Sequence, residues 1–351
     1  MMKKLLIFFF ILVSGVGAIC ASDTQVDGIW YDFDSATQTA TVTYRGNSSE
    51  EYADEYSGSV VIPSSVIYNA ATYTVTSIRS YAFSRCKSLS SITIPESVTS
   101  IEAGSFSECA LTSVTINSEA ILNNKKFSNI FSLNNIFGST VTEYIIANDV
   151  KSIGLCAFSS CTSLTTVTIP ESVTTIGAQA FQGCSSLASI TIPNSVKSIG
   201  TSAFYACKSL TSVVIPDSVI AILGGTFWDC TSLKSVTIGK GVTNIENAFA
   251  FCYELTYLYC NAITPPAVNK SLFENNAMKY GYLFVPCESK HDYEEHAIWG
   301  EFEYIECVAS EGIENASSSR IENRGSLVLK NGQVLILRNG KMYTMQGAEV
   351  R

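Results

Sequence analysis

The sequence predicts a solenoid that is mainly β, with short helical or irregular turns, built from stacked copies of one 23-residue unit. The first observation is repetition: Ser163–Pro170 (SLTTVTIP), Ser186–Pro193 (SLASITIP) and Ser209–Pro216 (SLTSVVIP) follow one another at intervals of 23 residues. The second is the alternation of apolar and polar residues within these segments, which is typical of a half-buried strand. Because one unit cannot bury its apolar residues alone, the units must stack around a continuous core.

Residues 1–21 are predicted to be a secretory signal peptide. Lys3 and Lys4 precede the apolar run Leu5–Val13, which is too short to span a membrane, and small residues follow it. Cys20 leaves an alternative open, because a cysteine just after such a run can carry a lipid anchor. The protein is therefore expected to be extracellular or on the outer cell surface. It would contact a membrane only through that anchor or through attachment linked to its secretion.

Residues 22–74 are predicted to form an N-terminal β cap, because an open solenoid end exposes apolar core and unpaired strand edges. Residues 75–260 hold about eight units, one of them enlarged at residues 118–149. Each unit reads V-x-x-I-x-x-x-A-F-x-x-C-x-x-L-x-x-V-x-I-P-x-S, so it has two extended pieces and a turn that inserts Phe and Cys into the core. The phenylalanine column is Phe83, Phe106, Phe158, Phe181, Phe204, Phe227 and Phe249.

Seven of the twelve cysteines form a second column, at Cys86, Cys109, Cys161, Cys184, Cys207, Cys230 and Cys252. An even number of cysteines in an exported protein usually indicates disulfides. However, equivalent side chains on neighbouring coils lie about 4.8 Å apart, whereas the Cβ atoms of a disulfide lie about 3.5–4.5 Å apart. The column is therefore interpreted as inert thiols in the core. Any disulfide is expected among Cys260, Cys287 and Cys307.

The segment after the repeats is predicted to hold a mixed C-terminal cap at residues 261–310, a polar linker at 311–319 and a β-rich tail at 320–351. Two Asn-Gly pairs separate three short strand candidates in the tail, a pattern typical of hairpins. The tail has six basic and two acidic residues, so its charge is +4 while the rest of the chain carries −13. One interpretation of the tail is a small β-meander that only packs on the cap.

The 23-residue unit with its cysteine column resembles the BspA-like family of bacterial surface leucine-rich repeats. Ile136–Gly138 in the enlarged unit and the flanking segments Val26–Tyr31, Tyr56–Pro63 and Cys260–Ala262 are also similar to parts of that family. The resemblance implies a leucine-rich-repeat solenoid with a β-hairpin N-terminal cap, exported to the cell surface or medium, which mediates protein–protein interaction or adhesion. Its implied partners are extracellular or surface proteins of the host matrix, host cells or other bacteria. The tail resembles the C-terminal sorting tails of the type IX secretion route.

Composition and motifs argue against catalysis. The chain has only two histidines, His291 and His296, and their spacing of five does not suit a metal site on one helix face. No nucleophile elbow, phosphate-binding loop or dinucleotide fingerprint occurs in the sequence. With a formal net charge of −9, the chain is not expected to bind nucleic acid. We therefore expect no enzyme activity, no cofactor and no metal site.

The expected binding surface is the exposed strand column of the solenoid, which is rich in threonine and ends at Tyr257 and Tyr259. Its threonines are Thr93, Thr115, Thr168, Thr191 and Thr237. The preference of exposed strands for threonine explains the same pattern without a ligand. A second candidate is an aromatic patch of Tyr205 and Trp228 on neighbouring coils, with Phe251 and Tyr253 one coil on, which either packs on the C-terminal cap or binds a ligand. Aromatic faces and hydroxyl rows suit sugars, so a glycan-binding module is the alternative function.

Overall fold

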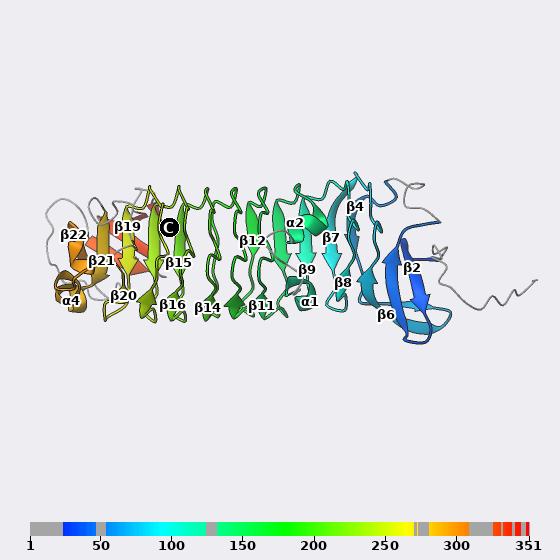
Figure 1. Cartoon of the computed structure of the whole chain (residues 1–351), viewed down its shortest axis with the longest axis horizontal. Coiled ribbons are helices and arrows are strands. Elements are labelled where there is room, and N and C mark those ends of the chain that lie inside the picture. Colours follow the sequence, from blue (N-terminus) through cyan, green and yellow to red (C-terminus); the bar gives the residue numbers. More distant parts are fainter. Residues whose placement is uncertain are drawn as a thin grey trace, which may run out of the picture.

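The computed structural model describes residues 24–46, 54–123, 132–269, 272 and 281–308, together with the strands of the tail between 326 and 350. The chain forms an elongated solenoid with the N-terminal β cap at one end and the C-terminal cap and tail at the other (Figure 1). The mainly β solenoid predicted from the repeats is confirmed. The predicted signal peptide, Cys20 and the predicted linker lie outside the described residues.

The longer strands of the coils pair in parallel and keep the same register from coil to coil. Ser212 lies opposite Ser235, and Ser235 lies opposite Tyr257, so each repeat position forms a straight column. The strands form two five-stranded sheets, here called together the long sheet. They are β4 (Gly58–Val61), β7 (Leu89–Ile94), β9 (Ser113–Ile116), β10 (Glu143–Ile146), β12 (Thr166–Thr168), β15 (Ser212–Ile215), β17 (Ser235–Ile238), β19 (Tyr257–Cys260), β21 (Tyr282–Pro286) and β22 (Tyr304–Val308).

The V-x-x-I pieces form strands of two residues, which run along the lower edge of the view in Figure 1. They are β8 (Ser100–Ile101), β11 (Ser152–Ile153), β13 (Thr175–Ile176), β14 (Ser198–Ile199), β16 (Ala221–Ile222), β18 (Asn244–Ile245) and β20 (Ala267–Val268). Glycine lets successive coils approach closely near this edge. A Cβ atom added to Gly200 would lie 2.3 Å from the backbone nitrogen of Ala178 on the preceding coil.

The N-terminal cap contains two antiparallel units. In the first, β2 (Ile29–Asp34) pairs with both β1 (Gln25–Val26) and β3 (Thr39–Thr43). The second is the hairpin of β5 (Ser65–Tyr68) and β6 (Ala71–Ile78). β6 pairs in parallel with both β3 and β8, which joins the cap to the repeats. We assigned Tyr56–Pro63 to this cap, but β4 within it pairs in parallel with β7, so the long sheet begins inside the assigned segment. The carboxylate of Asp54 accepts hydrogen bonds from the Ser88 amide and hydroxyl, both at 2.7 Å, and fixes this first coil on the second.

At the other end, the C-terminal cap continues the coil pattern, because β21 and β22 extend the long sheet in parallel. η2 (Cys287–Ser289), α4 (Lys290–Glu294) and η3 (Trp299–Glu301) then cover the end of the core. Tyr293 and Trp299 are fully buried there. The Tyr293 hydroxyl donates to the Ala262 carbonyl at 2.7 Å, and the Trp299 indole donates to the Pro266 carbonyl at 2.8 Å. These bonds satisfy the polar atoms of two large side chains that seal the last coil.

A stack of aromatic rings runs along the core. From Phe158 to Phe249, neighbouring phenylalanine rings are parallel within 6°, and their centroids are 4.9–5.5 Å apart. The enlarged unit keeps the stack continuous with two rings that the repeat pattern does not supply. Phe137, from α2 (Leu133–Phe137), packs on Phe106, and Tyr144 of β10 packs on Phe158. α1 (Glu119–Leu122) lies at the start of the same unit, capped by the Ser118 side chain.

Candidate interaction surface

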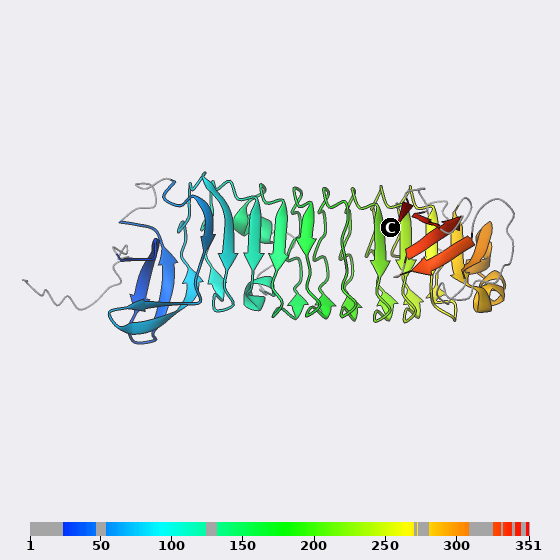
Figure 2. The same cartoon turned by 180° about the vertical axis from the view of Figure 1, so that it is seen from behind.

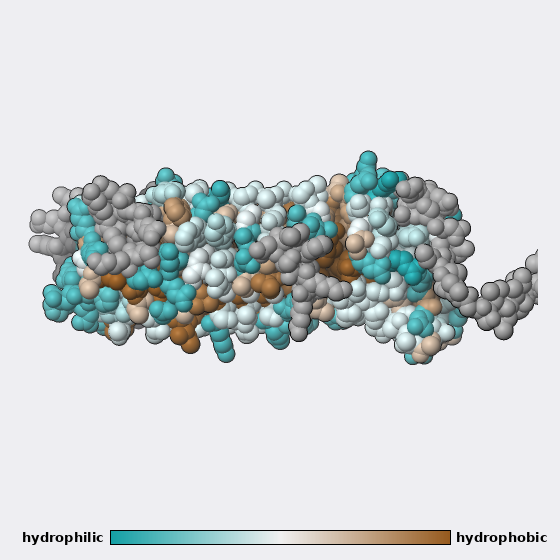
Figure 3. Space-filling view, viewed as in Figure 1, coloured by the Kyte–Doolittle hydropathy of each residue, from teal (hydrophilic) through white to brown (hydrophobic). Residues whose placement is uncertain are grey.

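The outer face of the long sheet carries the predicted column of hydroxyls. Thr168 and Thr191 are exposed and Thr93 and Thr115 are partly exposed. We call these four threonines the hydroxyl strip. The parallel register aligns Thr93 with Thr115, and Ile145 of β10 lies between Thr115 and Thr168 in the same column. Thr191 occupies the equivalent repeat position on the next coil, outside the assigned strands. The low charge of the coils is visible on the other wide face as well, where the middle coils are mostly pale in the hydropathy colouring (Figure 3).

The predicted exposure of Thr237 and Tyr259 is wrong. In this column the exposed fraction falls from 40% at Val214 to 6% at Thr237 on the next strand, and it is 4% at Tyr259. Phe284, which follows in the same column, is also 4% exposed. Repeat spacing alone gives no sign of this change, because Thr191 and Thr237 occupy equivalent positions. This column is therefore covered on β17, β19 and β21, whereas Glu306, its next residue on β22, is exposed.

An aromatic cluster lies on this part of the face, with two of its rings buried, Tyr257 and Tyr282 partly buried and Tyr304 41% exposed. We call Tyr257, Tyr259, Tyr282, Phe284 and Tyr304 the aromatic platform. Their rings stack across neighbouring strands, with centroids 4.7–5.9 Å apart and interplanar angles of 15–22°. The sequence indicated only the first two of these residues. The other three follow from the continuation of the parallel sheet into the C-terminal cap.

The tail forms an antiparallel four-stranded sheet of β23 (Ser326–Lys330), β24 (Gln333–Arg338), β25 (Lys341–Thr344) and β26 (Glu349–Val350). In Figure 2 this sheet lies in front of the long sheet, over the strands that carry the platform. β23 contacts β22, the last strand of the solenoid. The position of the tail explains why side chains on an outer face are buried.

A separate cluster of aromatic side chains lies on the turns that carry the Phe and Cys columns. Trp228 contacts Phe251 with ring centroids 5.2 Å apart, and Phe251 contacts Tyr253 edge-to-face at 5.9 Å. Tyr253 is 66% exposed, while Trp228 and Tyr205 are partly exposed. We call Trp228, Phe251 and Tyr253 the turn cluster. Phe251 reaches this cluster because it follows Phe249, the core phenylalanine of the same coil, by two residues in the turn.

The column cysteines are thiols, and all are buried except Cys109, which is partly buried. The thiols of Cys184, Cys207 and Cys230 each donate to the carbonyl of the core phenylalanine on the preceding coil, at 3.2 Å. Burial raises the pKa of the Cys207 thiol from 9.0 to about 12, because a thiolate would lose its hydration. These thiols are therefore poor nucleophiles and do not form a reactive site.

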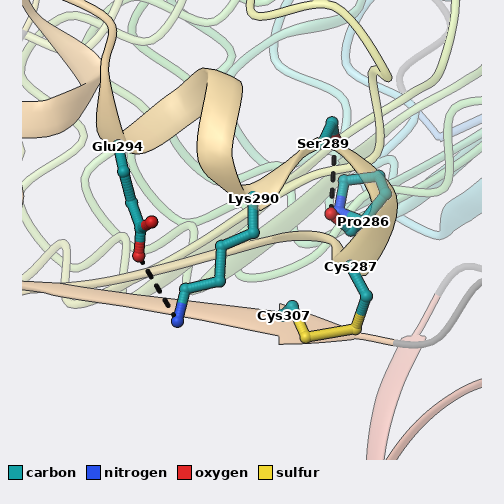
Figure 4. Close-up of a disulfide and its surroundings, with 6 residues drawn as sticks. All are labelled: Pro286, Cys287, Ser289, Lys290, Glu294 and Cys307. Carbon is teal, nitrogen blue, oxygen red and sulfur yellow. Dashed lines mark hydrogen bonds and ion pairs between the residues drawn. A yellow bond between two sulfur atoms is a disulfide. The ribbon is translucent and has the colours of Figure 1, made fainter.

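One disulfide joins Cys287 and Cys307, a pairing among the three cysteines that the sequence left open. It connects η2 to β22 at the end of the solenoid, beside the ion pair of Lys290 and Glu294 at 3.5 Å (Figure 4). Cys260 stays a thiol and accepts a hydrogen bond from the Tyr293 hydroxyl at 3.2 Å.

The two histidines lie in the C-terminal cap. His291 is exposed on α4, whereas His296 Nδ1 accepts hydrogen bonds from the backbone nitrogens of Ile298 and Trp299 at 3.2 and 3.3 Å. His296 thus holds the turn before η3. Across the described ranges, no group of three or more His, Cys, Asp and Glu side chains could hold a metal ion. In the same part of the chain, no helix is long and apolar enough to cross a membrane.

The chain matches solved structures of leucine-rich repeat proteins from bacteria. A leucine-rich repeat protein of Bacteroides ovatus is 25% identical, with a TM-score of 0.46 over 81% of this chain and 67% of its own. A leucine-rich cell surface protein of Faecalibacterium prausnitzii is 22% identical, with a TM-score of 0.27 over 74% of this chain and 98% of its own. The pneumococcal vaccine antigen PcpA is 15% identical, with a TM-score of 0.43 over 82% of this chain and 98% of its own.

No curated protein matches the chain. The family model described as the BspA type leucine-rich repeat region matches residues 64–145 and 137–256 with six copies. Those residues are more than half of the chain, and they contain the Phe and Cys columns described above. The chain therefore belongs to the BspA-type leucine-rich repeat family.

Proposed function

We propose that the protein is exported and acts at the cell surface or in the surrounding medium as a non-catalytic adhesin. Its partners would be proteins of the host matrix, of host cells or of other bacteria. The observation that carries the proposal is the hydroxyl strip, a long regular surface without a reactive group. The thiols, which are the reactive side chains of the coils, are buried in the core instead. A leucine-rich repeat protein of this family is consistent with protein–protein interaction, because stacked coils give extended surfaces for a partner.

Binding to immobilised matrix extract, intact host cells and intact bacterial cells tests this proposal. We expect the double variant Thr168→Glu and Thr191→Glu to weaken capture at least about ten-fold, because two carboxylates must be desolvated in the contact. The matched control is Ser198→Glu with Thr201→Glu, which adds the same charge at exposed positions away from the strip. Equal capture of all three proteins would contradict binding through the strip. No capture of the unmodified protein by any of the three surfaces would contradict adhesion.

The alternative function is glycan binding, and the exposed turn cluster is the observation that favours it. Sugars pack their C–H faces on aromatic rings, and Tyr253 is the most exposed ring of the cluster. A glycan array with the unmodified protein and with Trp228→Ala, Tyr205→Ala and Tyr253→Ala would test it. Specific hits that disappear in these variants support a lectin, and an array without hits removes this alternative.

Export rests on the sequence of residues 1–21 and of the tail. N-terminal sequencing of the exported protein is expected to begin near residue 22. A diacylglyceryl group on Cys20 would instead support the lipid anchor, and Cys20→Ser would then release the protein from the membrane. For the sorting-tail proposal, deletion of residues 320–351 is expected to retain the protein inside the cell envelope. Unchanged export of that variant would overturn the sorting role.

A further inference from the structure

We propose that the aromatic platform is a docking surface for the face of a β-sheet, and that β23–β26 of the same chain occupy it. A partner would then reach the platform only after the tail is displaced. This inference goes beyond the adhesion proposal, which places the partner on the hydroxyl strip. The two can fail separately, because one concerns Thr168 and Thr191 and the other concerns the strands from β17 onward.

The first argument is the pattern of burial. Val214 is 40% exposed, and Thr237, on the adjacent strand and in the same column, is 6% exposed. Tyr259 and Phe284 continue the column at 4% each. Together with Val308 they form a hydrophobic cluster of their own, separate from the solenoid core. An outer sheet face with its own buried cluster must have a cover, and the tail sheet lies there in Figure 2.

The second argument is the orientation of the rings, which favours a polypeptide over a sugar. The rings of Tyr257 and Tyr282 stack at 22°, and those of Tyr282 and Tyr304 at 21°. Because Tyr282 is stacked between Tyr257 and Tyr304, both of its ring faces are in contact with other rings, and it offers its ring edge and hydroxyl to the outside. A sugar would need a free ring face, whereas a second β-sheet can pack its side chains on such a ridged apolar surface at about 10 Å between sheets.

The third argument is charge. Residues 281–308 contain seven carboxylates and one lysine, whereas residues 326–351 contain four basic side chains and one glutamate. The occupant therefore carries the opposite charge to the surface around the platform, which favours this pairing over a random contact. The apolar strand sequences SLVLK and QVLILR also favour packing of the tail on another apolar surface, because an apolar sheet face is normally buried against a second layer.

The test uses the full chain with a protease site inserted between residues 311 and 319. The folded protein is cut, and size exclusion with mass spectrometry measures how much of the C-terminal fragment stays with the solenoid. We expect the fragment to co-elute at low ionic strength and to be released as the salt concentration rises, because opposite charges are then screened. Separate elution of the fragment at low salt would overturn the proposal. If the fraction of fragment that is released is the same at every salt concentration, opposite charge does not contribute to the pairing, and the third argument is wrong.

A variant that restores the repeat pattern gives the matched comparison. Tyr259→Thr with Phe284→Thr places the usual column residue on both strands, so the coils should still fold, and we expect at least about ten-fold less retained fragment. The control is Phe251→Ser in the turn cluster, which is expected to retain the fragment. If the double variant lacks the native thermal transition, it is unfolded, and co-elution of the fragment from the cut wild-type protein is then the test of the proposal. A doubled mass of the uncut chain in light scattering would show that a second copy supplies the tail, which would overturn occupation by the same chain.

Discussion

The column thiols should resist alkylation in the folded protein. Burial raises the pKa of Cys207 from 9.0 to about 12, so at pH 8 its thiolate fraction is about a thousand-fold lower than that of an ordinary cysteine. The thiolate is the species that reacts with iodoacetamide. Cys207 is also fully buried, and its proton is held by the Phe181 carbonyl at 3.2 Å. From the lower thiolate fraction and the burial together, we expect labelling of Cys207 to be about a thousand-fold slower than that of an exposed cysteine.

Intact-mass spectrometry at pH 8 measures this rate. The background protein carries Cys20→Ser, which leaves the nine thiols of the described residues and one disulfide. The reference is an added cysteine at an exposed position, Ser189→Cys, which should gain its adduct quickly. In denaturant all nine thiols should react, and with a reductant the two cysteines of the disulfide should react as well. Rapid addition of several adducts to the native background protein would refute the interpretation of the column as core.

Three further predictions use the same coils. Burial raises the folded-state pKa of Cys207 and Cys252 above the unfolded value, so their stabilisation is fully present below about pH 9 and is lost as the pH rises toward 12. Each should lower the free energy of unfolding by about 1 kcal/mol between pH 9 and pH 10, measured by urea titration; a flat profile would contradict their burial. Gly200→Ala should cost about 1–3 kcal/mol, because its Cβ would meet the preceding backbone at 2.3 Å. Gly224→Ala, whose nearest contact is a side-chain oxygen at 3.3 Å, should change stability by less than about 1 kcal/mol, and equal costs would contradict the close approach. Deletion of residues 26–62 or of 261–307 should make the repeats aggregate, because β7 or the last coils lose their cover; soluble, cooperatively unfolding repeats would show that neither segment is a cap.

Repetition made the fold predictable. The Phe and Cys columns follow from a spacing of 23 residues, because equal spacing in a solenoid puts equivalent residues on top of each other. The enlarged unit was the exception within the repeats. Its spacing showed where the extra residues lie, but it could not show that Phe137 and Tyr144 fill the ring stack. Phe137 comes from the inserted residues and Tyr144 replaces the usual valine of the strand column, so their positions depend on packing against rings of other coils.

The cap boundaries were less predictable than the coils. Tyr56–Pro63 looks like cap sequence because it lacks the repeat's Phe and Cys, yet β4 pairs with β7. At the other end, β21 and β22 continue the long sheet although their sequences do not match the unit. Strand pairing depends on backbone groups, which every sequence has, so a departure from the side-chain pattern does not end a sheet.

The solenoid, its two core columns and the three cysteines available for a disulfide can all be read from short segments and their spacing. The pairing of Cys287 with Cys307 depends on the tertiary structure, and so does the exposure of Thr191 beside the burial of Thr237. The two threonines occupy the same position in their units, but Thr237 lies beside Tyr259 in its column and the tail sheet lies over this part of the long sheet (Figure 2). That difference is made by β23–β26, which are distant in the chain, and no local pattern records a contact between distant segments.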